Sequence, residues 1–197
     1  MKVTLIDSPV ANVANIARAL RACGAELEVT HDPHAIARAS KLVLPGVGSF
    51  AAAMQFLETT RIDAAIREAV TNDALLLGIC VGHQLLFDSS SEMGSTRGLG
   101  LLRGQVERFD GPLPVPQIGW NRVTGRGPLF DGIEDDTPFY FVNSFAARHV
   151  ASEIASADYN GSFTAAAQEQ RVFGVQFHPE KSSTAGLQVL RNFVQWN

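Results

Sequence analysis

A cysteine between two glycines has the clearest chemical pattern in this sequence. Gly78-Ile79-Cys80-Val81-Gly82 completes the apolar run Ala74–Ile79, which is typical of a strand buried on both faces of a parallel sheet. Small residues around a nucleophile let the chain turn sharply from a strand into a helix, here expected over His83–Ser89, and hold the nucleophile exposed and strained. The helix dipole then favours the thiolate. We predict that Cys80 is a nucleophile, although free cysteines are often simply core residues.

A histidine and a carboxylate follow another apolar strand near the C-terminus. His178-Pro179-Glu180 comes directly after Val172–Phe177, and residues two apart at a strand end can point the same way. Cys80, His178 and Glu180 have the chemical make-up of a thiolate, a proton shuttle and an acid that orients the shuttle. The remaining histidines have no such partner in the sequence. We expect three of them to be solvated and one to face the exterior of its helix: His31, His34, His149 and, on the helix, His83.

A glycine-rich turn, Pro45-Gly46-Val47-Gly48-Ser49-Phe50, follows the apolar segment Lys41–Leu44. Ligands of open α/β sheets bind at the carboxyl ends of strands. Glycines in such a turn permit backbone angles that aim amide N–H groups at an anion. Taken alone, the pattern fits an ordinary loop equally well.

The first half of the sequence alternates between strand and helix patterns, which predicts a parallel sheet with helices on both faces. The expected elements are a strand at Lys2–Asp7, a helix capped by Asn12 and ended by Gly24, a strand at Ala25–Thr30, a short helix opened by Asp32-Pro33, a strand at Lys41–Leu44, and helices near Ala51–Glu58 and Arg61–Thr71. Cys23 lies on the apolar face of its helix, so we expect it to be packed in the core.

The second half has short segments separated by Gly, Pro and Asn, which indicates antiparallel additions to the sheet. Strands are expected at Gln105–Phe109, Val115–Val123, Phe139–Val142, Phe163–Gln168 and Val172–Phe177, before a final helix capped by Ser182 or Ser183. The predicted fold class is therefore α/β, with an open, mostly parallel sheet flanked by helices. We expect residues 1–197 to form a single domain.

Composition excludes several classes of protein. The chain is 46% hydrophobic with a net charge of −4 and mixed charges, so it lacks a basic surface for nucleic acid. It has neither a run long enough to span a membrane nor the apolar core of a signal peptide, and we expect a cytoplasmic protein. Two cysteines and the absence of CxxC or HExxH patterns predict neither disulfides nor a metal site.

Six segments together resemble the class I (triad) glutamine amidotransferases, and within them the glutaminase subunits of imidazole glycerol phosphate synthases of histidine biosynthesis. GICVG and FHPE are shared by the wider class, whereas PGVG together with IGWN and HPEKS narrows the resemblance. The segments are LPGVGSF at Leu44–Phe50, GICVGHQLLFDSSSE at Gly78–Glu92, GLGLLRGQVERF at Gly98–Phe109, VPQIGWN at Val115–Asn121, YFVNSF at Tyr140–Phe145 and GVQFHPEKS at Gly174–Ser182.

The resemblance implies hydrolysis of L-glutamine without a cofactor. Cys80 would attack the side-chain amide, His178 would protonate the departing ammonia and activate water, and Glu180 would orient His178. Backbone amides of Val47 and Val81 would form the oxyanion hole. The resemblance also implies a set of glutamine-binding residues: Gly46, Gly48, Gln84, Glu92, Ser144 and Phe145. For Gln84 and Glu92 the alternative is ordinary placement on a helix surface.

The resemblance further implies a heterodimer with a cyclase partner, whose (β/α)₈ barrel receives the ammonia. The implied interface residues are Asn12, Trp120, Asn121 and Lys181. Trp120 fits a buried core position equally well, since tryptophans anchor both cores and interfaces.

The sequence departs from the family pattern at three places. Ser8-Pro9-Val10-Ala11 replaces two glycines near the expected interface, and Gln117 and Asn143 stand where histidines are common. An amide forms hydrogen bonds as neutral imidazole does, but it cannot titrate near neutral pH. Two alternatives therefore stay open, namely another amidotransferase or cysteine hydrolase of similar fold, and a catalytically impaired homologue that only binds the partner.

Overall fold

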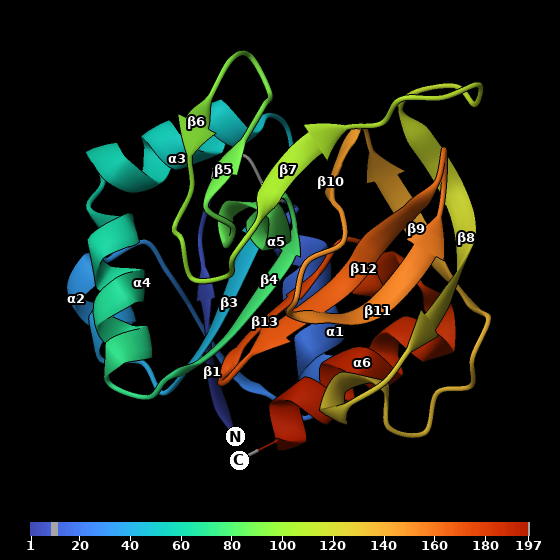
Figure 1. Ribbon diagram of the computed structural model, residues 1–197. Helices are drawn as coiled ribbons and strands as arrows, with labels where there is room; N and C mark the ends of the chain where they lie inside the picture. The colour runs from blue at the N-terminus through green and yellow to red at the C-terminus, as the bar shows by residue number, and fades with distance from the viewer. Residues whose placement is uncertain (9–11, 197) are drawn as a thin grey trace.

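Strands and helices alternate through the first 80 residues, as predicted. The protein is described by a computed structural model that covers residues 1–8 and 12–196 (Figure 1). The elements are β1 (Lys2–Ile6), α1 (Val13–Ala22), β2 (Glu26–Thr30), α2 (Pro33–Ala37), β3 (Lys41–Gly46), α3 (Phe50–Thr59), α4 (Ile62–Thr71) and β4 (Leu75–Cys80). Asn12 and Asp32 cap α1 and α2 by accepting backbone N–H groups with their side chains, which explains where these helices begin.

The rest of the chain forms shorter elements. They are α5 (Val81–Leu85), β5 (Ser89–Ser90), β6 (Thr96–Arg97), β7 (Gln105–Arg108), β8 (Gln117–Gly125), η1 (Pro128–Phe130), β9 (Thr137–Asn143), β10 (Phe145–Ala147), β11 (Glu153–Asp158), β12 (Ser162–Glu169), β13 (Val172–Val175), η2 (Pro179–Lys181) and α6 (Ser183–Gln195). The five predicted strands are confirmed. β5, β6, β10 and β11 were not predicted, and α5 begins earlier and is shorter than the helix expected over His83–Ser89.

One nine-stranded sheet organises the molecule in the order β2-β1-β3-β4-β13-β12-β11-β8-β9. The pairs from β2 to β13 are parallel, and the pairs from β13 to β9 are antiparallel. A smaller sheet has the order β10-β7-β5-β6. This confirms the predicted parallel core with antiparallel additions. β13 lies where the two kinds of pairing meet.

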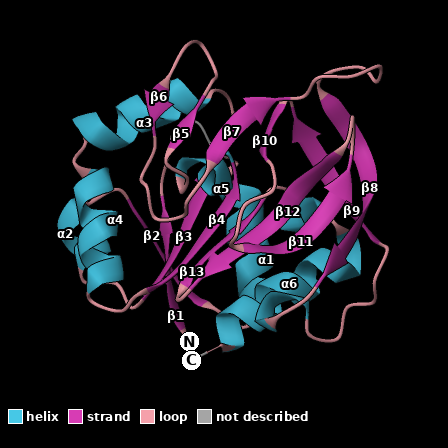
Figure 2. Ribbon diagram, in the orientation of Figure 1, coloured by secondary structure: helices cyan, strands magenta, loops and turns pink. Residues whose placement is uncertain are grey.

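Helices cover both faces of the parallel half. α1 and α6 pack together on one face, and α2, α3 and α4 pack together on the other (Figures 1 and 2). Every residue of β3 and β4 is buried as a result. The two strands that lead into the glycine-rich turn and the cysteine are therefore held between two layers.

Aromatic side chains fill the core of the antiparallel half. Five phenylalanines from η1, β9, β12 and the segment after β13 form successive ring contacts, with centroids 4.2–6.4 Å apart: Phe130, Phe139, Phe141, Phe163 and Phe177. Burying one such side chain stabilises the fold by roughly 1.5–3 kcal/mol. This cluster fixes β9 against the end of β13, from which His178 follows.

Candidate active site

Cys80 ends β4 in a strained conformation. Its φ is 55° and its ψ is −111°, a combination that residues with a side chain rarely adopt. A Cβ at Gly82 would overlap the carbonyl oxygen of Leu44, so only glycine lets the chain turn this closely against β3. The sharp turn predicted around the cysteine is therefore present, although α5 has only five residues.

The glycine-rich turn lies beside Cys80 because β3 and β4 pair in parallel, with Gly46 opposite Cys80. Val47 directly follows β3 and Val81 directly follows β4, so both lie at the same edge of the sheet. A Cβ at Gly46 would lie 2.7 Å from the Gly82 nitrogen, so this close approach also requires glycine. Gly46 is buried against the turn, whereas Val47 is 36% exposed.

His178 and Glu180 form a tight buried pair directly beyond β13. His178 Nδ1 lies 2.9 Å from Glu180 Oε1, and the two side chains are 5% and 1% exposed. Ser182 fixes this segment, since its hydroxyl donates to the His178 carbonyl oxygen and accepts the backbone N–H of Tyr140. Ser182 occupies the predicted cap position of α6 but makes no capping hydrogen bond with its side chain. Its hydroxyl holds the histidine segment instead.

The surroundings of His178 favour the imidazolium. Burial lowers the pKa of His178, but hydrogen bonds and charge interactions with Cys80 and Glu180 outweigh burial and raise the pKa to about 10. The imidazole ring therefore lies between the Cys80 sulfur and the Glu180 carboxylate.

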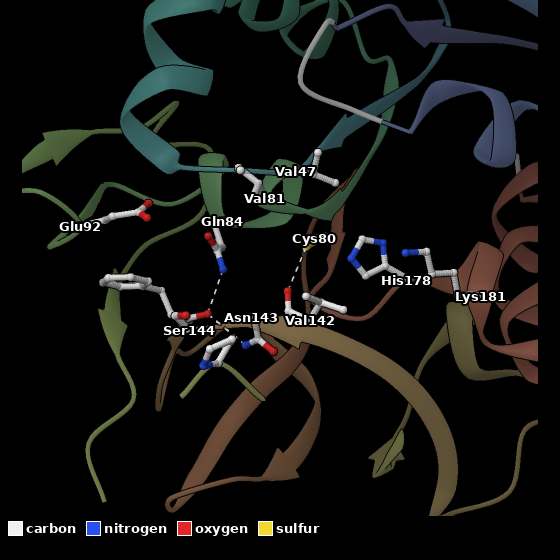
Figure 3. Close-up of a pocket in the computed structure, with 13 residues that line it drawn as sticks. Val47, Cys80, Val81, Gln84, Glu92, Val142, Asn143, Ser144, His178 and Lys181 are labelled. Atoms are coloured by element: carbon white, nitrogen blue, oxygen red, sulfur yellow. Dashed lines mark hydrogen bonds between the residues drawn. The ribbon is translucent and has the colours of Figure 1, made fainter. Parts of the chain in front are cut away.

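A cavity of about 330 Å³ brings these residues together (Figure 3). Cys80 and His178 reach it from the ends of β4 and β13, and Glu180 lies behind His178. The other lining residues are Val47, Gly48, Val81, Gln84, Glu92, Pro116, Val142, Asn143, Ser144, Phe145 and Lys181. Of the residues expected to bind glutamine, Gly46 does not line the cavity.

Gln84 and Glu92 are anchored by hydrogen bonds that leave one oxygen of each toward the cavity. Gln84 is buried, and its Nε2 donates to the Phe145 carbonyl oxygen at 2.8 Å and to Gln176 Oε1 at 2.9 Å. Glu92 Oε2 accepts the backbone N–H of Phe50 at 2.6 Å, at the N-terminus of α3. The alternative of a helix-surface position is wrong for Gln84. Glu92 follows β5 and lies on no helix.

His83 contradicts its predicted position on the exterior of a helix. The side chain is completely buried, in edge-to-face contact with Phe87 at 5.1 Å. Neither ring nitrogen has a hydrogen-bond partner among the described residues, and burial lowers the pKa of His83 to about 3. Because α5 lies against the sheet, His83 packs on Gly174 of β13. His31, His34 and His149 are exposed and Cys23 is buried, as predicted.

Exposed apolar residues adjoin the cavity on β8 and β9. Trp120 is 56% exposed and Ile118 is 65% exposed, so the core alternative for Trp120 is wrong. The Trp120 ring lies 5.9 Å from that of Tyr140, and Lys181 Nζ lies 5.7 Å from the Tyr140 ring centroid. We call Ile118, Trp120, Tyr140 and Lys181 the aromatic patch. Lys181 also lines the cavity, so the patch borders its mouth.

Other residues singled out from the sequence are also found in the described structure. The Asn121 side chain donates to the Asp158 carbonyl oxygen and accepts the N–H of Arg122, and Asn12 is exposed beside α1. Gln117 and Asn143 are buried and face each other across β8 and β9. Within the altered N-terminal loop, Ser8 is buried, whereas Pro9, Val10 and Ala11 lie outside the described residues.

The site includes residues that the sequence analysis did not single out. Gln176 bonds to Gln84 and approaches Cys80, while Val142 and Pro116 line the cavity. A signal existed for Gln176, because it is the one polar residue in the run VFGVQF. Within the described ranges 1–8 and 12–196, no helix combines the length and the apolar character needed to cross a bilayer.

The comparisons with known proteins identify the class to which this fold belongs as the glutamine amidotransferases. The family model described as "Glutamine amidotransferase class-I" matches residues 4–196, and the chain belongs to this family. A relative named "Imidazole glycerol phosphate synthase subunit HisH", from Acinetobacter baylyi, is 42% identical and covers 100% of this chain and 98% of its own. A protein of the same name from Caulobacter vibrioides is 43% identical over 98% of each chain.

Solved structures support the fold. One described as "Crystal structure of glutamine amidotransferase" has a TM-score of 0.77 and 18% identity, and covers 98% of this chain and 97% of its own. A glutamine amidotransferase from Thermotoga maritima has a TM-score of 0.71 and 15% identity, with coverages of 99% and 96%. At such identities the likeness concerns the fold alone.

Proposed function

We propose that this chain is the glutaminase subunit of an imidazole glycerol phosphate synthase. The observation that carries the proposal is the single cavity shared by Cys80 and His178, with Glu180 bonded to the far nitrogen of the histidine. Identity above 40% to HisH subunits along nearly the whole chain supports the choice within the class.

The first half of the reaction forms a thioester. The Cys80 thiolate attacks the side-chain amide carbon of glutamine, and the carbonyl oxygen gains negative charge. Backbone N–H groups of Val47 and Val81 are the donors proposed for this oxyanion. When the C–N bond breaks, the His178 imidazolium gives its proton to the leaving nitrogen, and ammonia departs.

The second half releases glutamate. Neutral His178 takes a proton from water, the resulting hydroxide attacks the thioester carbon, and the C–S bond breaks to restore the Cys80 thiolate. Glu180 accepts the hydrogen bond from His178 Nδ1 throughout, which keeps Nε2 directed at the reacting atoms and stabilises the imidazolium. One proton of the water restores the imidazolium, the oxygen enters the new carboxyl group, and the second proton leaves when this group ionises to glutamate.

The polar rim of the cavity suits the amino-acid end of glutamine. Glu92 supplies negative charge and Gln84 an acceptor oxygen for the substrate ammonium. Backbone groups of Gly48, Ser144 and Phe145 are proposed to hold the carboxylate and close the cavity. A φ of +86° at Gly48 is natural for glycine and lets the turn approach the substrate.

The aromatic patch is proposed to bind the (β/α)₈ barrel of the cyclase partner. Its exposed tryptophan is the kind of residue that anchors interfaces, and the cavity that releases ammonia opens beside it. Asn12 and Asn121 are proposed to extend this surface. The ammonia would pass directly into the barrel, which forms imidazole glycerol phosphate and AICAR.

The test is glutamate release by the chain alone, with the cyclase, and with the cyclase bound to its substrate. We expect feeble activity alone and an increase of orders of magnitude in the loaded complex. Equal activity with and without the cyclase, and no complex with it, would favour another amidotransferase or a cysteine hydrolase. Stable binding without any glutamate release would identify an impaired homologue.

A further inference from the structure

We propose that Gln176 is a positioning residue of this site, which donates a hydrogen bond to the Cys80 thiolate and fixes the orientation of Gln84. The inference rests on the proposed function, since it concerns the state of the nucleophile and the grip on glutamine. It concerns a residue outside the catalytic cysteine, histidine and glutamate.

Gln176 lies behind the cavity, directly after β13. Its side chain is completely buried, and it does not line the cavity. Burying a carboxamide without partners costs roughly 1–3 kcal/mol, so a glutamine here must satisfy its polar atoms locally. Its neighbours in the described chain are Gln84, at 2.9 Å from Gln176 Oε1, and Cys80, whose Sγ lies 4.0 Å from Nε2.

The direction of these hydrogen bonds is fixed by a backbone carbonyl. The oxygen of Phe145 can only accept, so the Gln84 atom 2.8 Å away is the NH₂ nitrogen. The same nitrogen donates its second hydrogen to the Gln176 atom that lies 2.9 Å away. This Gln176 atom must therefore be the acceptor, Oε1. The NH₂ group of Gln176 therefore points at sulfur, with no freedom to flip.

In addition to the His178 ring, Cys80 faces one acceptor and one donor. Its Sγ lies 3.9 Å from the Val142 carbonyl oxygen and 4.0 Å from Gln176 Nε2. A neutral thiol can donate to the carbonyl, whereas a thiolate is repelled by that oxygen and accepts from the amide. Gln176 thus stabilises the reactive form specifically, and Val142 stabilises the resting thiol.

The same hydrogen bonds determine which side-chain atom of Gln84 can contact the substrate. Both hydrogens of its NH₂ group are used inside the protein, so its oxygen is the atom left for the cavity (Figure 3). An oxygen accepts from the ammonium or the amide of glutamine but repels a carboxylate. Gln176 therefore links the nucleophile to the residue that orients the substrate.

The experiment is the pH profile of Cys80 alkylation by iodoacetamide in the full chain, read on the Cys80 peptide by mass spectrometry. Gln176→Met keeps the length of the side chain but removes donor and acceptor. We expect the midpoint of the profile to move upward by about one pH unit, because a hydrogen bond to an ion is lost. Gln168→Met, on the neighbouring strand β12 and outside the cavity, should leave the midpoint unchanged.

Steady-state glutaminase kinetics with the cyclase give the second readout. Gln176→Met should raise KM for glutamine about tenfold through the freed Gln84, and Gln84→Met should raise it similarly. The double variant should lose little more than either single one, since the residues act as a unit. Additive effects together with an unmoved alkylation profile would overturn the inference.

A measurement on the unaltered chain covers the case in which Gln176→Met does not fold. The side-chain amide resonances of Gln176 should shift as Cys80 titrates, while those of Gln168 should not. Invariant Gln176 resonances would refute the hydrogen bond directly. Absence of glutaminase activity in the unaltered complex would instead refute the proposed function, and the alkylation profile can be read in either case.

Discussion

The parallel and antiparallel halves of the large sheet contribute different kinds of residue to the cavity. In the parallel half, β3 and β4 are entirely buried and deliver Val47, Cys80 and Val81 through tight glycine-dependent turns. In the antiparallel half, β8 alternates between buried and exposed positions and presents Ile118 and Trp120 to solvent. The proposed nucleophile and oxyanion donors come from the covered parallel half, and the exposed side chains proposed to bind the partner come from the half-open antiparallel one.

β13 explains how both halves serve one site. It pairs in parallel with β4 and in antiparallel with β12, so the segment after it reaches the cysteine from the antiparallel side. His178 and Glu180 therefore stand at the boundary between the halves. A disturbance within one half is expected to change either chemistry or assembly, and rarely both.

The largest effect should come from the covered half. Cys80→Ala should lower kcat for glutamine hydrolysis by about 10⁴ or more, because the nucleophile is lost, while binding to the cyclase stays unchanged. Glutamate release and a pull-down with the cyclase check both. Cys23→Ala is the matched control and should keep activity. Residual turnover above about a thousandth of the original would exclude Cys80 as the nucleophile.

The next effect concerns the turn beside the cysteine. Val47→Pro removes one backbone N–H and should lower stimulated kcat by about 10²–10³, the usual loss for one oxyanion donor. Glutamine binding should change little. Val47→Ala keeps the N–H group and should behave as the original chain. If Val47→Pro is fully stimulated in the loaded complex, the donor must be sought elsewhere.

A substitution in the half-open antiparallel half should weaken binding to the cyclase. Trp120→Ala should weaken binding to the cyclase by about 2 kcal/mol, or roughly 30-fold, as expected for an interface anchor. Because the side chain is exposed, the melting temperature should stay the same. Calorimetric titration measures the affinity, and Val29→Ala, an exposed residue on the distant strand β2, is the control. Unchanged affinity would remove Trp120 from the interface.

The smallest effect is a pH dependence of stability in the covered half. The pKa of His83 is lowered to about 3, whereas the unfolded chain titrates near 6.5. The unfolded state therefore binds the extra proton first, so stability is fully present above pH 6.5 and falls as pH decreases toward 3.

His83→Met should remove this part of the acid sensitivity. Comparing pH 7.5 with pH 5.5, we expect the unaltered chain to lose about 1.4 kcal/mol more unfolding free energy than the variant. Urea titrations at both pH values measure the difference. His149→Met, which changes an exposed histidine, should retain the sensitivity. Parallel losses in the original chain and in His83→Met would show that another group is responsible.

Local patterns were sufficient to predict the parallel half and to single out Cys80, His178 and Glu180, which the structure brings together. Apolar runs separated by caps and glycines located β1 to β4, and the glycines around Cys80 indicated the turn. β11 was not predicted because its sequence EIASAD has one β-branched residue, Ile154, and no aromatic residue, whereas strands favour both kinds. The residues proposed to bind glutamine were predicted from family resemblance, since no local pattern marks them.

Positions that depend on distant partners were harder to predict. His83 was expected at the helix surface because its neighbours in the sequence do not reveal that α5 is a single turn pressed against β13. Gln176 and Gln84 meet across 92 positions of sequence, and neither partner can be inferred from its own segment. Ser182 has the sequence of a cap, but the backbone groups that it bonds belong to the histidine segment and β9.

The backbone of Cys80 has a consequence for how stability and reactivity are related in this protein. A φ of 55° with a ψ of −111° suits glycine, and a residue with a Cβ held there costs of order 1–3 kcal/mol. The fold would thus be more stable with glycine at residue 80, but a nucleophile at this position requires a side chain. Selection for thermal stability alone would favour glycine at residue 80, so the nucleophilic role proposed for Cys80, and not the stability of the fold, accounts for a cysteine at this position.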